Sequence, residues 1–64
     1  MKEYTEEDLY KNFKVNSIGM KFAYVTVLPE PEDKALESHA GRKGTLKFRI
    51  ENEKRIFHSF IREF

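Results

Sequence analysis

The 64-residue sequence predicts a single α+β domain, built from a short N-terminal helix and a small, strongly curved antiparallel sheet. A capped, acidic helix start at Thr5, an aromatic and β-branched run over residues 20–28 and an alternating run over residues 45–51 lead to this prediction. Charged residues make up 36% of the chain and aromatic residues 14%, and disordered chains of such polarity usually lack Phe and Tyr. Because a chain of this length has room for only one core, residues 1–64 are expected to form one domain.

The first predicted element is an amphipathic helix over residues 5–13. Thr5 is placed to cap it, and the acidic side chains that follow favour the positive end of the helix dipole. Leu9, Tyr10 and Phe13 supply its apolar side. Asn16, Ser17 and Gly19 are expected to separate this helix from the strand over residues 20–28.

The run over residues 20–28 predicts a strand that is central or covered on both sides, because both of its alternating faces are largely apolar. Pro29 and Pro31 end it, since neither can donate a ladder hydrogen bond. Residues 31–41 contain good helix formers but few apolar side chains, so we expect one or two helical turns within a solvated loop.

Residues 45–51 show the strict period of two that is typical of a sheet covered on one side only. Leu46, Phe48 and Ile50 share one face, which leaves Lys47 and Arg49 on a basic, exposed face. The terminal segment over residues 56–64 allows two interpretations. Its apolar residues fall within an arc of roughly 140° on a helical wheel, which favours a helix; a strand that pairs with residues 45–51 is the alternative.

The stretch from Gly19 to Ile50 resembles the KOW-type and Src-homology-like small β-barrels. The matching features are the strand over residues 22–27, the loop over residues 29–40, the turn Gly41-Arg42-Lys43-Gly44 and the strand that begins at Thr45. The resemblance implies a barrel-like curved sheet. It also implies binding to RNA, to DNA or to proteins of the ribosome or polymerase.

Several classes of function are disfavoured by composition. With no Cys there is neither a disulfide nor a thiolate metal site, which fits a reducing cytoplasm. No apolar run approaches the roughly 20 residues of a membrane span, and the acidic start is the opposite of a signal peptide's basic lead. His39 and His58 show no spacing that links them to a nucleophile or a carboxylate pair. We therefore expect no catalytic activity, no metal, no cofactor and no membrane association.

The charge is divided unevenly along the chain. Residues 1–40 carry five Lys and eight acidic residues, a net −3, whereas residues 41–64 carry seven basic and three acidic residues, a net +4. This division predicts either a nucleic-acid surface, whose affinity would fall with salt, or a solvated face balanced by the acidic loop. Stacking aromatic residues are expected to be missing from this face, because Phe48 points the other way. The nucleic-acid candidates are Arg42, Lys43, Lys47, Arg49, Lys54 and Arg55.

The terminal apolar stripe either closes the core or docks on another protein or on a second copy of the chain. The acidic loop offers a second protein surface, which could mimic a nucleic-acid backbone. The protein-interface candidates are Phe57, Phe60, Phe64, Glu30, Glu32, Asp33 and Glu37. The first hypothesis is a non-catalytic binding or regulatory module that docks on a protein partner, as an inhibitor or an accessory subunit; nucleic-acid binding through residues 42–55 is the alternative.

Overall fold

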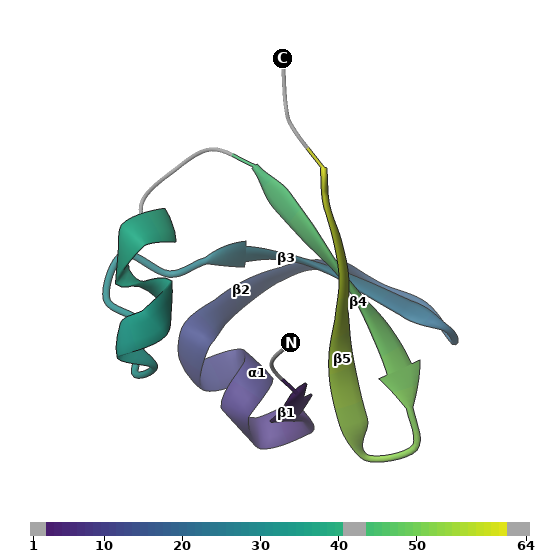
Figure 1. Cartoon of the computed structure of the whole chain (residues 1–64). Helices are drawn as coiled ribbons and strands as arrows, with labels where there is room; N and C mark the ends of the chain where they lie inside the picture. The colour runs from purple at the N-terminus through teal and green to yellow at the C-terminus, as the bar shows by residue number, and fades with distance from the viewer. Residues whose placement is uncertain (1–2, 41–43, 62–64) are drawn as a thin grey trace.

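A curled antiparallel sheet forms most of the molecule in the computed structural model, which describes residues 3–40 and 44–61 (Figure 1). The order of its five strands is β1-β5-β4-β3-β2, in which β2 to β5 follow one another as a meander. The sheet curls into a half-barrel (Figure 1). The strands are β1 (Glu3–Thr5), β2 (Phe13–Ile18), β3 (Phe22–Val27), β4 (Thr45–Glu51) and β5 (Lys54–Ile61). This architecture confirms the predicted small α+β domain.

The predicted N-terminal helix is present as α1 (Glu6–Asn12), between β1 and β2. Thr5 caps it as expected, because its Oγ1 accepts a hydrogen bond from the backbone N–H of Asp8 at 3.1 Å. Leu9 is fully buried, whereas Tyr10 lies on the exposed side of the helix. The loop after β3 contains the expected helical turns as a 3₁₀ helix, η1 (Lys34–His39).

The core lies on the concave, inner face of the sheet, where α1 and η1 pack against it. β3 is central, as predicted, and its residues Ala23, Val25 and Val27 are buried on this face. Its opposite face is only half-buried, so β3 is covered on one side rather than two. Edge-to-face contacts join the rings at the centre, with centroids 5.4 Å apart for Tyr4 and Phe13 and 5.2 Å apart for Phe13 and Phe48.

The strands β1 and β2 were not predicted from the sequence. Residues 13–18 were expected to hold only a helix end and a break, yet they form a strand whose pairing with β3 shifts register between Val15 and Ser17. Asn16 is the extra residue of this bulge, and its side-chain amide donates a hydrogen bond to Thr26 Oγ1 at 2.7 Å. A polar residue that would break a regular strand is thus accommodated by a bulge.

The terminal segment is a strand, β5, so the preference for a helix over residues 56–64 was wrong within the described part, and the hairpin alternative is correct. Phe57 pairs with Phe48 and Phe60 pairs with Leu46, so both Phe side chains point inward although they are three residues apart. The register shift between these pairs, at His58, is a second bulge. It produces the i, i+3 spacing that imitates a helical stripe.

Candidate functional site

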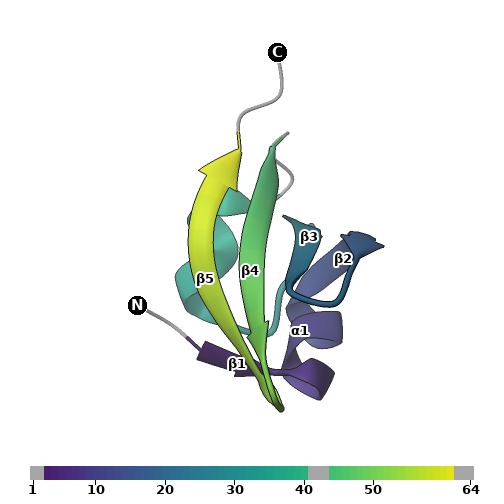
Figure 2. The same ribbon diagram turned by 90° about the vertical axis from the view of Figure 1, so that its right-hand side faces the viewer.

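An apolar hollow of about 270 Å³ opens on the inner face between β4, β5 and η1. Figure 2 shows the teal coil of η1 behind β5 and β4, which places it on this side of the sheet. The hollow is smaller than typical small-molecule sites, which begin at about 300 Å³, and suits one or two inserted side chains. Its lining residues are Tyr4, Leu36, His39, Leu46, Phe48, Phe57 and Phe60.

Phe60 forms the rim of this hollow and is 48% exposed, which is unusual for a Phe side chain whose neighbours are core residues. Its ring packs against Gly44, where a Cβ atom would lie 2.5 Å from the ring Cζ. Ile61, the next residue, is 41% exposed on the other face. The sequence candidates Phe57 and Phe60 are therefore brought together at one surface, while Phe64 lies outside the described residues.

The edge of β5 beside the hollow has little strand cover. β1 pairs with β5 only from Lys54 to Ile56, and β4 occupies the opposite edge. Figure 2 shows that β1 lies beside only the lower end of β5, where that strand begins. Within residues 3–40 and 44–61 no strand pairs with this edge from Phe57 to Ile61. Unpaired backbone groups along such an edge are a template for another extended chain.

The convex, outer face of the sheet carries a different group of side chains. Lys47 Nζ lies 4.0 Å from the ring centroid of Phe22 and 5.8 Å from that of Tyr24. The imidazole of His58 contacts Phe22 edge-to-face at 5.5 Å. The expectation that this face lacks aromatic residues was wrong: Phe48 points inward, but β3 places Phe22 and Tyr24 directly beside the basic residues of β4.

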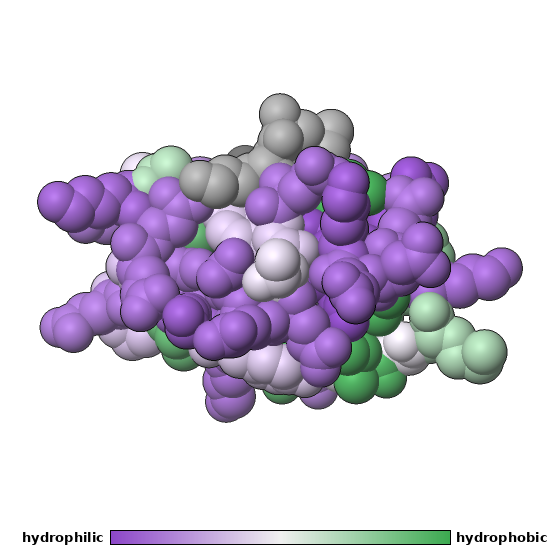
Figure 3. Space-filling model, turned by 90° about the horizontal axis from the view of Figure 1, so that it is seen from below, coloured by the Kyte–Doolittle hydropathy of each residue, from purple (hydrophilic) through white to green (hydrophobic). Residues whose placement is uncertain are grey.

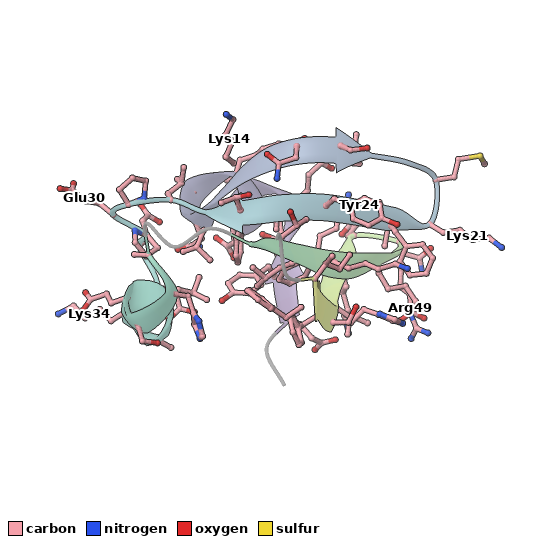
Figure 4. The ribbon with its side chains drawn as sticks, turned by 90° about the horizontal axis from the view of Figure 1, so that it is seen from above. Lys14, Lys21, Tyr24, Glu30, Lys34 and Arg49 are labelled. Carbon is pink, nitrogen blue, oxygen red and sulfur yellow. The ribbon has the colours of Figure 1, made fainter. Side chains whose placement is uncertain are left out.

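Charges on the outer face are only partly compensated. Arg49 pairs with Glu51 at 3.0 Å, whereas Lys14, Lys21 and Lys47 have no carboxylate within ion-pair distance among the residues that the structure describes. Figure 4 shows Lys21 and Arg49 at the same end of the sheet, near Tyr24, and Lys14 pointing away from β2. The outer face therefore has a positive excess.

The predicted basic cluster is divided by the fold. Arg55 points to the inner face, is 6% exposed and bonds Glu6 at 3.3 Å and the carbonyl oxygen of Asn52 at 3.0 Å. It therefore joins α1 to the β4–β5 turn and does not contribute to the exposed basic surface. Lys54 lies on the outer face and pairs with Glu3 at 3.9 Å. Arg42 and Lys43 lie outside the described residues.

The acidic loop candidates are not equivalent. Glu30, Glu32 and Glu37 are exposed, and Figure 4 places Glu30 at the end of the sheet opposite Lys21. Asp33 instead fixes the loop: its carboxylate accepts hydrogen bonds from the Tyr4 hydroxyl at 2.8 Å and the Ala35 N–H at 3.0 Å. Burial, with a contribution from this carboxylate, raises the pKa of Tyr4.

Two buried groups, one in α1 and one in β1, hold the loop in place, and sequence reasoning missed both. Asn12 donates to the carbonyl oxygen of Asp8 at 2.8 Å and accepts from the backbone N–H of Asp33 at 2.7 Å. Tyr4 lies in β1, which is too short to show a strand pattern. The only signal for Asn12 in the sequence was its position at the end of an amphipathic helix.

The end of the molecule that carries α1 and the β4–β5 turn is mostly hydrophilic (Figure 3). Across residues 3–40 and 44–61, no cluster of three or more His, Asp or Glu side chains is arranged to hold a metal ion. In the same part of the chain, no helix has the length and apolar character needed to cross a membrane. The apolar hollow with the β5 edge and the basic outer face are thus the two distinctive surfaces.

Comparison with known protein families, with curated proteins and with solved structures finds no match to this chain.

Proposed function

We propose that the protein is a non-catalytic binding module that docks on a protein partner through the apolar hollow at β5 and η1. The observation that carries this proposal is the half-exposed ring of Phe60 at the rim of a hollow lined almost entirely by apolar side chains. A partner that covers the ring and fills the hollow removes this apolar area from water, which is the main driving force of association.

The hollow suits an inserted side chain better than a free small molecule. An apolar cavity of about 150 Å³ holds one benzene ring, so this hollow accepts one or two side chains of a partner. Among the described residues that line the hollow, His39 is the one titratable side chain apart from Tyr4, so the proposed recognition rests on shape and apolar contact. The mode of action that follows is occupancy of a partner's surface, as by an inhibitor or an accessory subunit.

Affinity capture with matched variants tests the proposal. The immobilised protein is incubated with native lysate of the producing organism, treated with nuclease, and compared with Phe60→Ser and Tyr10→Ser. Tyr10 is a fair control because it is an exposed aromatic residue on α1, at 52% against 48% for Phe60. We expect a protein retained by the wild type and by Tyr10→Ser and lost with Phe60→Ser, while all three proteins stay folded. Equal retention by all three would refute the docking site.

A second candidate function, binding of single-stranded nucleic acid, is supported by the outer face. Lys47 lies over two aromatic rings, and Lys14 and Lys21 add positive charge without a paired carboxylate among the described residues. Basic side chains interleaved with aromatic rings are the features that bind phosphates and bases together. The resemblance of residues 19–50 to KOW-type barrels implies the same class of ligand.

Charge reversal distinguishes this candidate from a merely solvated face. Lys47→Glu with Arg49→Glu is compared with Lys11→Glu with Lys34→Glu, which changes the net charge equally but on α1 and η1. If the outer face binds, a labelled oligothymidine should lose at least tenfold in affinity with the first pair only, and wild-type affinity should fall with salt. An equal loss of affinity in both double variants would indicate only non-specific electrostatic attraction and would refute this candidate function.

A further inference from the structure

We propose that Tyr24, on the outer face of the sheet, is the base-stacking residue of a single-stranded nucleic-acid site, and that the Lys47 ammonium binds the adjoining phosphate. The inference rests on the second candidate function, because it names the group on the outer face that distinguishes a nucleic acid from other polyanions. It deepens that function by giving different roles to the two aromatic rings beside Lys47.

Tyr24 lies in a row of outward-facing side chains that crosses the sheet. It pairs with Ser17 of β2 on one side and with Lys47 of β4 on the other, and Lys47 in turn pairs with Ser59 of β5. Neighbouring strands lie about 4.8 Å apart, so the two large side chains of this row stand between two small ones. The row therefore leaves lateral room for a flat group against the Tyr24 ring.

The ring of Phe22, by contrast, is occupied by its neighbours. Lys47 Nζ lies 4.0 Å from its centroid, and His58 packs against it edge-to-face with centroids 5.5 Å apart. Lys47 Nζ lies farther from the Tyr24 centroid, at 5.8 Å, and within residues 3–40 and 44–61 no other aromatic ring contacts Tyr24. Phe22 thus positions the ammonium through a cation–π contact, and Tyr24 is the ring that has room for a base.

The charge beside Tyr24 is complementary to a phosphate. Lys47 has no carboxylate within ion-pair distance among the described residues, so a phosphate oxygen does not have to displace a protein partner. Figure 4 shows Tyr24 near Lys21 and Arg49, which extend the positive surface. The bases of a duplex are stacked on one another and do not reach such a ring. A single strand is therefore the ligand that uses the ring and the charge together.

Two strands of equal length separate stacking from charge: oligothymidine, and an abasic deoxyribose-phosphate strand. Tyr24→Leu keeps an apolar side chain but removes the ring, and Tyr10→Leu is the matched control on the exposed side of α1. We expect Tyr24→Leu to weaken oligothymidine binding about tenfold and to leave abasic binding unchanged. Lys47→Gln should weaken both and reduce the salt dependence, and Tyr10→Leu should bind both strands like the wild type.

A fluorescent side chain at the same position gives a second measurement that does not depend on affinity. The sequence contains no Trp, so Tyr24→Trp introduces the single indole of the chain, and a base stacked on an indole quenches its emission. We expect oligothymidine to quench Tyr24→Trp and the abasic strand to leave it unchanged. Neither strand should quench Tyr10→Trp. If circular dichroism shows that Tyr24→Leu is unfolded, this measurement decides the question.

The remaining outcomes overturn the inference. Equal affinity of the wild type for the two strands, or unquenched emission of Tyr24→Trp at saturating oligothymidine, refutes base stacking at Tyr24. If Lys47→Glu with Arg49→Glu still abolishes binding in that case, the second candidate function stands on phosphate contacts alone. Polyglutamate that binds as tightly as oligothymidine assigns the face to an acidic protein segment. Binding of neither strand at low salt refutes both the inference and the second candidate function.

Discussion

Gly44 is the position where one added methyl group should disturb both the fold and the hollow. The residue directly precedes β4, its φ is +144°, and an added Cβ would lie 2.5 Å from Phe60 Cζ and 3.1 Å from Cε2. The φ value lies in a region that side chains other than Gly rarely adopt. Gly44→Ala therefore combines backbone strain with a steric clash.

The magnitude follows from these two contributions. Backbone strain of this kind costs about 1–3 kcal/mol. The clash costs less, roughly 1 kcal/mol, because the ring is the free end of a half-exposed side chain and can rotate away at the loss of its packing. A domain of this size is stabilised by roughly 3–10 kcal/mol. The sum, about 2–4 kcal/mol, lowers the unfolding midpoint by roughly 8–32 °C.

Denaturant unfolding of four proteins tests this reasoning: the wild type, Gly44→Ala, Phe60→Ala and the double variant. If the ring clash contributes, Gly44→Ala should cost less in the Phe60→Ala background, by roughly 1 kcal/mol. Gly19→Ala is the matched control, because its added Cβ would meet only the carbonyl oxygen of Phe22 at 3.7 Å, an ordinary contact. Wild-type stability in Gly44→Ala, or an equal loss in Gly19→Ala, would contradict the reasoning.

Three further predictions concern the buried polar groups. The pKa of Tyr4 is raised in the folded chain. At a pH above about 10, the ordinary pKa of Tyr, the unfolded chain therefore loses a proton that the folded chain keeps. The free energy of unfolding should then fall with rising pH by up to about 1.4 kcal/mol per pH unit. Tyr4→Phe should remove this slope in denaturant unfolding at pH 9–11. The free energy of unfolding of Arg55→Met should stay within about 1 kcal/mol of the wild type. Met keeps an apolar chain in place of the buried Arg stem and removes a guanidinium whose Nε has no partner among the described residues. Arg55→Ala, which also removes the stem, should cost about 2–3 kcal/mol in the same assay. Asn12→Ala should cost about 1–3 kcal/mol and speed amide exchange at Asp33, whose N–H it leaves without its acceptor.

The sequence predicts those elements whose local pattern is regular. β4 was predicted with its bounds and both faces, because Thr45 to Glu51 alternate without interruption and Leu46 and Phe48 are buried as expected. α1 was predicted from its cap and acidic first turn, which are local signals. Neither prediction needed knowledge of a distant partner.

The remaining elements depend on pairing, which the sequence alone does not display. β1 is a strand only because its three residues meet Lys54 to Ile56, far along the chain. β2 and β5 each contain an extra residue, and a bulge breaks the period of two that identifies a strand. Strand pairing also explains why the aromatic residues of the outer face were missed. The register of β3 against β4, which the sequence does not display, sets Phe22 and Tyr24 beside Lys47.

The bulge at His58 connects these observations to the candidate site. A shift of one residue turns every following side chain of a strand to the opposite face. If His58 were paired in a regular ladder instead of bulged, Phe60 would point outward toward the lysines, and Ser59 would face the hollow in its place. With it, Phe57 and Phe60 both line the hollow, and His58 is free to contact Phe22 on the outer face. The irregularity that misled the helical interpretation of this segment is thus what builds the apolar surface of the candidate docking site.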